Sequence, residues 1–290
     1  MKVSKMASFP CVMGIVNVTP DSFYAASRVE DERELRRRVR QILDEGGSMI
    51  DVGACSTRPG SEPVSADEEL ERLGRALPIV GDAVAEWQGA GRTTDGGGAV
   101  LVSVDTFRAQ VAETCVRELG ADIINDISGG QLDEAMLGVV ARTGATYIMT
   151  HSRGTPQTMQ TLTDYGERGV VDEVARFFGD QLKKLAVLCG EGGLPCVLLD
   201  PGFGFAKTQA QNYALLRGLD RLRALLPGHP LLVGMSRKSM VYGLLGTDAG
   251  HSLNGTTVVN TYALLHGASV LRVHDVKEAA EAIRICGILA

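Results

Sequence analysis

The sequence lacks paired cysteines, an excess of basic residues and any long hydrophobic run. Its six cysteines are scattered, with no C-x-x-C pair, so we expect reduced thiols in a cytoplasmic protein and no metal site of cysteine and histidine. The net charge of −6 argues against nucleic-acid binding, which needs a basic face. No apolar stretch approaches the roughly 20 residues of a membrane span, and residues 1–10 lack the apolar core of a secretion signal. We therefore expect neither nucleic-acid nor membrane partners.

The composition is that of a folded, globular chain. With 44% hydrophobic and 22% charged residues, a chain of 290 residues can bury a large core, and this length is normal for one α/β barrel. No linker or low-complexity tail divides the sequence, so we expect one domain over residues 1–290 with its core at about residues 12–287. The glycine-rich stretch 89–98 is interpreted as a spacer loop, because it falls between a predicted helix and the next strand.

Eight short runs rich in β-branched and apolar residues recur along the chain and indicate strands. They are residues 12–17, 49–53, 100–105, 122–125, 146–150, 196–200, 231–234 and 270–274. Helical patterns alternate with them, which predicts a parallel sheet with right-handed crossovers. Eight such units in this length fit an α/β fold of the (β/α)8 TIM barrel type. A doubly wound open sheet is the alternative, but a Gly-x-Gly-x-x-Gly fingerprint is missing after the first run.

The first predicted helix carries both an apolar stripe and a row of arginines. Leu35, Val39, Ile42 and Leu43 recur at i, i+4, i+7 and i+8, which indicates one buried face. The arginine-rich stretch 33–40 lies on the same helix. We interpret that stretch as a solvent-exposed face and not as a site for phosphate or nucleic acid.

Polar side chains gather where seven of the eight predicted strands end. They lie at residues 17, 51–60, 105–107, 125–130, 200–205, 234–239 and 272–274. In a barrel the active site is built from the loops at the carboxyl ends of the strands. Burying an unpaired polar group costs roughly 2–7 kcal/mol, so many such groups on one rim predict a binding site at the C-terminal ends of the strands.

The residue types at this rim suggest a flat polar ring as one ligand. Asp105, Asn125 and Asp200 combine several acceptors with one amide donor, which suits the edge of a heterocycle. A carboxylate can pair bidentately with a guanidine-like edge, such as that of a 2-amino-4-oxo pterin or a purine.

The last two predicted strands carry cations and suggest an anionic group as the other ligand. Lys238, Arg272 and His274 lie where barrels often bind phosphate, and stretch 234–239 precedes a helical segment whose amides favour an anion. No nucleophile with a base and an acidic orienter is evident. This favours a reaction driven by leaving-group stabilisation, with charge neutralised by lysine, arginine and a metal ion.

The motifs at the strand ends resemble those of a known family. NVTPDSF, IDVGACSTRPGS, VDTF, INDISGG, LLDPGFGF, VGMSRKS and RVHDV occur in the order and at the spacings of the dihydropteroate synthases, over about residues 12–283. The resemblance implies a folate-biosynthesis enzyme, a transferase and sulfonamide target that is usually a homodimer. Such an enzyme joins 4-aminobenzoate to the methylene of 6-hydroxymethyl-7,8-dihydropterin pyrophosphate and releases 7,8-dihydropteroate and pyrophosphate.

The resemblance also implies roles for the matching positions. The residues that would hold the pterin are Asp105, Asn125, Asp200 and Lys238. Arg272 and His274 would bind the pyrophosphate, together with Asn17 through a bound magnesium ion, Mg(2+). The 4-aminobenzoate pocket would be formed by Phe205, Lys238 and Ser239. Asp21 and Phe23 would belong to a first loop that closes over the site. The substrate-binding residues Thr57, Arg58 and Pro59 would belong to a mobile second loop.

Two departures from the family pattern fall in these loops. The family usually has Ser-Asp-Gly-Gly after NVTPDSF, where this chain has YAASR at residues 24–28, and Ala54-Cys55 replaces the usual Gly-Glu. Because the core motifs are intact, these departures bear on loop behaviour and inhibitor response and not on the activity.

The implied mechanism uses Lys238, Arg272 and His274 as catalytic residues. Pyrophosphate would leave first, stabilised by magnesium, Arg272 and His274, and the neutral arylamine would attack the methylene cation that the dihydropterin delocalises. Three rival interpretations are a methyltetrahydrofolate-dependent methyltransferase on the same barrel, a Schiff-base aldolase with Lys238 as nucleophile, and a non-catalytic pterin-binding protein. SRKS with Arg-x-His favours the synthase, because a methyltransferase has no use for a pyrophosphate-binding group.

Overall fold

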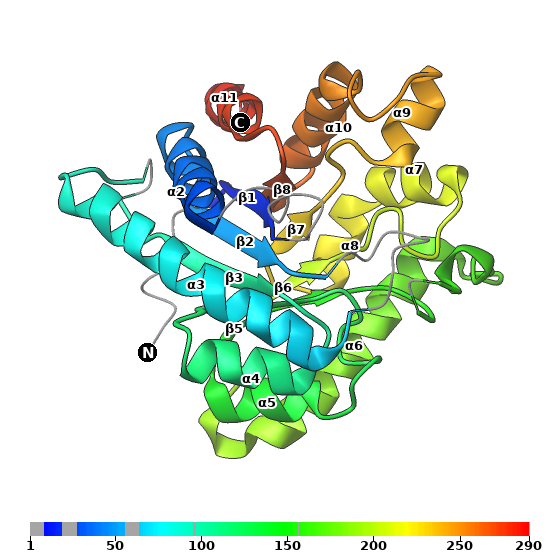
Figure 1. The fold of residues 1–290 in the computed structure, drawn as a ribbon. Helices are drawn as coiled ribbons and strands as arrows, with labels where there is room; N and C mark the ends of the chain where they lie inside the picture. The colour runs from blue at the N-terminus through cyan, green and yellow to red at the C-terminus, as the bar shows by residue number, and fades with distance from the viewer. Residues whose placement is uncertain (1–8, 19–27, 56–63, 95–96, 156, 290) are drawn as a thin grey trace.

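The computed structural model of this protein describes residues 9–18, 28–55, 64–94, 97–155 and 157–289. Within these ranges the chain forms a closed barrel of eight parallel strands in the order β1 to β8 (Figure 1). The strands are β1 (Cys11–Asn17), β2 (Met49–Gly53), β3 (Leu101–Asp105), β4 (Ile123–Asp126), β5 (Thr146–Thr150), β6 (Val197–Asp200), β7 (Leu231–Val233) and β8 (Ala268–Val273). Each predicted strand is present, with ends within two residues of the expected bounds. The predicted TIM barrel is therefore confirmed.

Helices surround the barrel on its outside and connect successive strands (Figure 1). They are α2 (Arg28–Asp44), α3 (Ala66–Gly89), α4 (Ala109–Arg117), α5 (Met136–Thr143), α6 (Gly169–Cys189), α7 (Gln209–Arg217), α8 (Leu219–Leu225), α9 (Ser239–Leu245), α10 (Leu253–Leu265) and α11 (Val276–Leu289), with the 3-10 helices η2 (Met159–Thr161) and η3 (Gly190–Gly192). None of the helices in the described ranges is both long and apolar enough to span a membrane.

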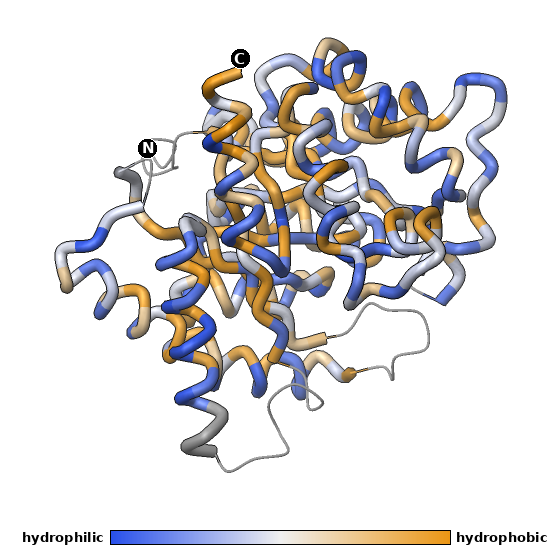
Figure 2. The backbone as a smooth tube through the Cα atoms, turned by 90° about the horizontal axis from the view of Figure 1, so that it is seen from above, coloured by the Kyte–Doolittle hydropathy of each residue, from blue (hydrophilic) through white to orange (hydrophobic). Residues whose placement is uncertain are grey.

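The apolar stripe of α2 faces the barrel, as the spacing predicts. Leu35, Val39, Ile42 and Leu43 are all buried. Figure 2 shows the same division along the chain, with hydrophobic residues on the central strands and both kinds alternating along the helices. Gly14 of β1 permits this packing, because a Cβ there would stand 2.6 Å from Cγ2 of Ile42. Glycine thus lets the helix lie close to the strand.

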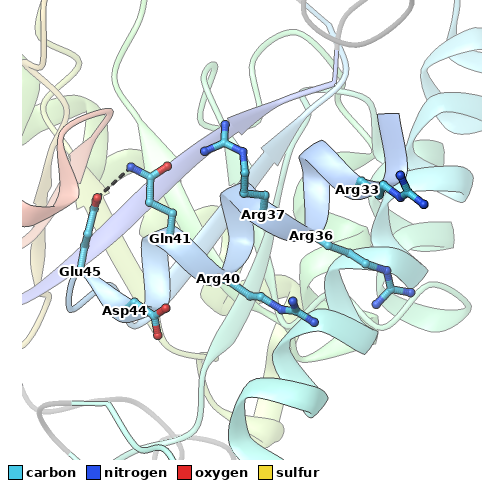
Figure 3. A pocket seen from close by; sticks show the side chains of 7 residues that line it. All are labelled: Arg33, Arg36, Arg37, Arg40, Gln41, Asp44 and Glu45. Carbon is cyan, nitrogen blue, oxygen red and sulfur yellow. Dashed lines mark hydrogen bonds between the residues drawn. The ribbon is translucent and has the colours of Figure 1, made fainter. Parts of the chain in front are cut away.

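The arginine-rich stretch of α2 is only partly the solvent-exposed face that we predicted. Arg36 and Arg40 form ion pairs with Glu86 of α3, and Figure 3 shows both side chains lining a pocket on the outer side of α2. Arg38, in contrast, is half-buried and donates through Nη2 to the carbonyl oxygen of His274, 2.8 Å away. The prediction was wrong for Arg38, because its guanidinium reaches a backbone acceptor that follows β8.

The inside of the barrel changes from apolar to polar along the strands. Alternate residues of a strand point inward. Toward the amino ends these are apolar and buried, among them Met13, Met49, Leu101, Ile123, Ile148, Leu198, Leu232 and Val270. The next inward positions toward the carboxyl ends include Asp51, Ser103, Asn125, Asp200 and Arg272. The alternation therefore places a polar layer directly above an apolar floor.

Candidate active site

Arg272 holds the polar layer together from the end of β8. Its Nε donates to Oδ2 of Asp51 at 2.6 Å, and its Nη2 donates to Oδ2 of Asp105 at 2.7 Å. The side-chain amide of Asn125 donates to the same Asp51 oxygen at 3.0 Å. Asp105 and Asn125 are also backbone partners across β3 and β4. Three predicted site residues are thus brought together, and a fourth residue, Asp51, joins them.

The carboxylate of Asp105 lies in an unusual electrostatic environment. Burial raises its pKa to about 7, although Arg272 acts in the opposite direction and Asp51 adds a second negative charge. A carboxyl group whose pKa lies near neutrality can be ionised or protonated according to what binds beside it. Asp105 can therefore act as an acceptor or as a donor toward a ligand.

Asp200, Lys238 and Arg272 converge on one point above the apolar floor. A Cβ placed on Gly234, the residue after β7, would lie 3.9 Å from each of Oδ2 of Asp200, Nζ of Lys238 and Cβ of Arg272. The three side chains therefore lie around the backbone of Gly234. The two halves of the predicted site, acceptors on one side and cations on the other, meet here.

Lys238 is held by the loop that follows β6. Its Nζ donates to the carbonyl oxygen of Phe203 at 2.7 Å and lies 4.6 Å from the centre of the Phe205 ring. Burial lowers the pKa of Lys238 to about 8, while Asp200 opposes this shift. Burial in turn raises the pKa of Asp200, and Lys238 again opposes the shift. Burial therefore disfavours the charged form of both side chains, and each side chain partly offsets this effect on the other.

His274 follows β8, and its imidazole is oriented by Ser236. Nδ1 of the ring lies 3.2 Å from Oγ of Ser236, and the backbone N–H of His274 donates to the same oxygen at 3.2 Å. Arg237, between Ser236 and Lys238, takes no part in the pocket, because it pairs with both carboxylate oxygens of Asp275. Within the SRKS stretch, Ser236 therefore contacts His274, Arg237 pairs with Asp275, and Lys238 lies at the candidate site.

Asn17 ends β1 at the same rim. It can supply one of the several oxygen ligands that a magnesium ion needs. A Cβ placed on Gly53 would lie 3.7 Å from Oδ1 of Asn17 and 3.7 Å from Oδ2 of Asp105. In the described ranges no group of three or more histidine, cysteine or acidic residues could hold a metal. Magnesium, however, often binds through substrate phosphates, water and one or two protein oxygens. The donor set fits such a substrate-bound ion and does not fit an ion held by protein alone.

Several predicted site residues remain untested by the geometry. Asp21, Phe23, Thr57, Arg58 and Pro59 lie outside the described residues. Ser239 begins α9 and is exposed beside Lys238.

Two residues of the polar layer were missed in the sequence. Asp51 is fully buried and could have been found from the alternation, because it stands two positions after the inward Met49. Lys207 is also buried and pairs with groups of the β6 loop, a contact that no sequence pattern indicates.

Not every polar residue at the rim faces the pocket. Asp126 follows Asn125 directly but points to the outside of the barrel. Its two oxygens accept hydrogen bonds from the N–H groups of Ser128 and Gly130 and from the hydroxyls of Ser128 and Tyr147. Asp126 therefore shapes the loop after β4, while its neighbour Asn125 lines the site.

Comparison with known proteins agrees with this geometry. The sequence profile of the pterin binding enzymes matches residues 13–274. The dihydropteroate synthase of Synechocystis sp. is 40% identical over 280 residues, which are 96% of this chain and 89% of that protein.

Two solved structures are similar over nearly the whole chain. The Yersinia pestis dihydropteroate synthase, in complex with a sulfonamide drug, has a TM-score of 0.81 and 36% identity and covers 97% of this chain and 94% of its own. The Thermus thermophilus dihydropteroate synthase, in complex with 4-aminobenzoate, has a TM-score of 0.78 and 35% identity and covers 98% and 99%. The chain belongs to the pterin binding enzyme family, and within it to the dihydropteroate synthases. It is a transferase of folate biosynthesis, as the sequence motifs predict.

Proposed function

We propose that this chain joins 4-aminobenzoate to the methylene carbon of 6-hydroxymethyl-7,8-dihydropterin pyrophosphate and releases pyrophosphate. The observation that carries the proposal is that Oδ2 of Asp200 and Nζ of Lys238 both lie 3.9 Å from a Cβ placed on Gly234, next to the Cβ of Arg272, whose guanidinium is held by Asp51 and Asp105. One pocket thereby offers acceptors for a polar ring and cations for an anionic leaving group. The Thermus thermophilus relative, which binds 4-aminobenzoate, supports the second substrate.

The pterin would lie across the polar layer. The carboxylate of Asp200 accepts from the N–H of Gly202 through Oδ1, which leaves Oδ2 for the amino edge of the ring. Asn125 is fixed by Asp51, so its amide oxygen can accept a ring N–H. Asp105, with its pKa raised to about 7 by burial, can meet either a donor or an acceptor on the ring.

The pyrophosphate would lie toward β8 and β1. Arg272 uses Nε–H and one Nη2–H for its two carboxylate partners among the described residues, and its other donors can face the anion. His274, whose ring is oriented by Ser236, would be the second cationic or donor group on this side. Asn17 would supply one oxygen to a magnesium ion that is held mainly by the phosphates. When bound, that ion would neutralise charge on the leaving group.

The aminobenzoate would lie beside Lys238, with the Phe205 ring as its apolar wall and Ser239 at its edge. Pairing of the substrate carboxylate with this end of α9 would leave its amine near the methylene carbon. The neutral amine attacks a cation that the dihydropterin delocalises, so the reaction needs alignment and exclusion of water more than a strong base. The roles of Asp21, Phe23, Thr57, Arg58 and Pro59 in covering the pocket belong to the same proposal.

A turnover assay with dihydropterin pyrophosphate and labelled 4-aminobenzoate tests this function. Purified protein should form labelled dihydropteroate and pyrophosphate, and only with magnesium present. Folded protein that binds pterin but forms no product would overturn the proposal.

We also propose a single domain over residues 1–290, a homodimer and a cytoplasmic location. Sedimentation equilibrium and fractionation of cells that express the chain would test the last two.

A further inference from the structure

Lys207 is a buried lysine that no proposed substrate contact uses. It lies between β6 and α7 with 4% of its surface exposed, and burying an amine is costly unless its polar hydrogens find partners. Its Nζ lies 3.0 Å from Nδ1 of His151, 2.9 Å from the carbonyl oxygen of Gly202 and 3.0 Å from that of Phe205. A charged amine can donate to all three, and a neutral one can donate twice and accept from the imidazole. Nζ bridges the three groups in either state.

Two partners of Lys207, the carbonyl oxygens of Gly202 and Phe205, belong to the loop after β6, whose backbone is held by several side chains. Five successive carbonyl oxygens each accept a hydrogen bond from a side chain: Gly202 and Phe205 from Lys207, Phe203 from Lys238, Gly204 from Gln160 and Ala206 from Tyr165. Lys207 therefore supplies two of the five ties. Its Nζ joins the carbonyl oxygens of Gly202 and Phe205, and the backbone N–H of Phe205 also donates to the carbonyl oxygen of Gly202 at 3.1 Å.

The loop needs these ties because its backbone is unusual. Gly202, Gly204 and Ala206 all have positive φ, at 72°, 82° and 50°, and such a conformation is strained for alanine. His151 packs against the start of the loop, since a Cβ on Gly202 would overlap its carbonyl oxygen. The His151 ring is itself fixed edge-on against Phe177, with centroids 5.0 Å apart. Lys207 thus ties a strained loop to a rigid support.

The same loop provides both contacts that hold Lys238 in the pocket. These are the Phe203 carbonyl oxygen, 2.7 Å from Nζ of Lys238, and the Phe205 ring. We infer that Lys207, with His151, is a positioning residue: it holds the loop after β6 so that Phe203 and Phe205 set the place of Lys238. The kinetic side of this inference rests on the proposed condensation.

Lys207→Met tests the inference, since it keeps most of the stem but cannot bridge the three groups. The variant should raise KM for 4-aminobenzoate and lower kcat, together on the order of 100-fold in kcat/KM, as for a small misplacement of a reacting group. The dissociation constant of the bare pterin should rise much less than that of 4-aminobenzoate, because Asp105, Asn125 and Asp200 are placed by their strands. Hydrogen exchange at residues 202–206 should also become faster, which is a readout independent of turnover. Lys184→Met, an exposed lysine of α6, is the control and should match wild type in all three.

Two substitutions of His151 keep the test decisive if Lys207→Met folds poorly. His151→Asn retains a polar group that can accept or donate near the position of Nδ1 and should stay close to wild type, whereas His151→Leu should reproduce the Lys207→Met defect. Equal effects of the two His151 variants, or equal losses of pterin and aminobenzoate binding, would overturn the positioning role. A wild-type protein that forms no dihydropteroate would instead refute the proposed function. Hydrogen exchange at residues 202–206 would then still show whether Lys207 holds the loop after β6.

Discussion

Arg272 and Asp51 form an ion pair, 2.6 Å from Nε to Oδ2, that joins β8 to β2 across the intervening strand β1. Asp51 is fully buried, and its second oxygen, Oδ1, has no hydrogen-bond partner among the described residues. The pair fixes the guanidinium in the plane from which it also reaches Asp105. The position of the guanidinium that we propose to bind the pyrophosphate therefore depends on a buried residue of β2.

Asp51→Ala should destabilise the fold as well as the site. Removal of one partner of a buried ion pair costs about 3–5 kcal/mol when the other charge is left uncompensated. Arg272 keeps Asp105 as a second partner, so we expect a smaller loss than this in the free energy of unfolding, measured by urea denaturation. Glu34→Ala removes the exposed partner of Arg37 and should change stability little. If the Asp51 variant is as stable as its Glu34 counterpart, the ion pair is not a stabilising contact.

Asp200→Asn should weaken pterin binding while the loop after β6 keeps its shape. The amide oxygen can still accept from Gly202, but the charge that faces the ring is lost. Loss of one charged hydrogen-bonding partner costs about 2–3 kcal/mol, which calorimetry with a bare pterin can measure. Asp248→Asn, at an exposed turn before α10, is the matched control. Unchanged pterin affinity in Asp200→Asn would remove this residue from ring recognition.

Much of this architecture could be predicted from the sequence, because strands and helices have different periods and the rim collects at strand ends. The helical stripe around Val39 and Ile42 and the polar end of β3 at Asp105 both depend on such local patterns. Alternation also separates Asn125, which faces inward, from Asp126, which faces outward, although both look equally suited to a site as residue types. Local sequence patterns thus identify the polar strand ends, and the alternation along each strand predicts which of their side chains face the inside of the barrel.

The remaining features depend on contacts between segments far apart in the chain. Arg38 reads as one more surface arginine until β8 brings the carbonyl oxygen of His274 to within 2.8 Å of it. In the sequence Lys207 looks like an ordinary loop lysine. In the fold, His151 at the end of β5 lies 3.0 Å from its Nζ. No local spacing encodes either distance, because each depends on how neighbouring strands are staggered in the closed barrel.

Asn17→Ala should affect magnesium-dependent binding selectively. An amide oxygen is one of the few ligands that the protein can offer to an ion held by phosphates. We expect weaker binding of pterin pyrophosphate in the presence of magnesium and nearly unchanged binding of the bare pterin, both measured by calorimetry. The same titrations without magnesium serve as the control. Equal losses for both ligands would identify Asn17 as a structural residue of the β1 end.

Asp105 should make stability depend on pH. Burial raises its pKa to about 7 in the folded chain, whereas an unfolded chain has a value near 3.9. Its contribution to stability is therefore fully present below about pH 4 and is lost as the pH rises through about 7. Asp105→Asn does not titrate, so the stability of wild type relative to this variant should fall over that range. Denaturation curves at several pH values give the comparison, and parallel pH profiles would contradict it.

Lys238→Met should impair the reaction more than the fold. The variant keeps much of the side-chain stem beside Phe205 but loses the cation that faces Asp200 and the donor to Phe203, so we expect a sharp fall in kcat and higher KM values for both substrates. Lys277→Met removes an exposed lysine of α11, paired only loosely with Glu281 at 4.0 Å, and should behave like wild type. Both variants must first show matching thermal unfolding, so that lost structure is not mistaken for lost chemistry. Wild-type kinetics in a well-folded Lys238→Met protein would show that this cation takes no part in the condensation.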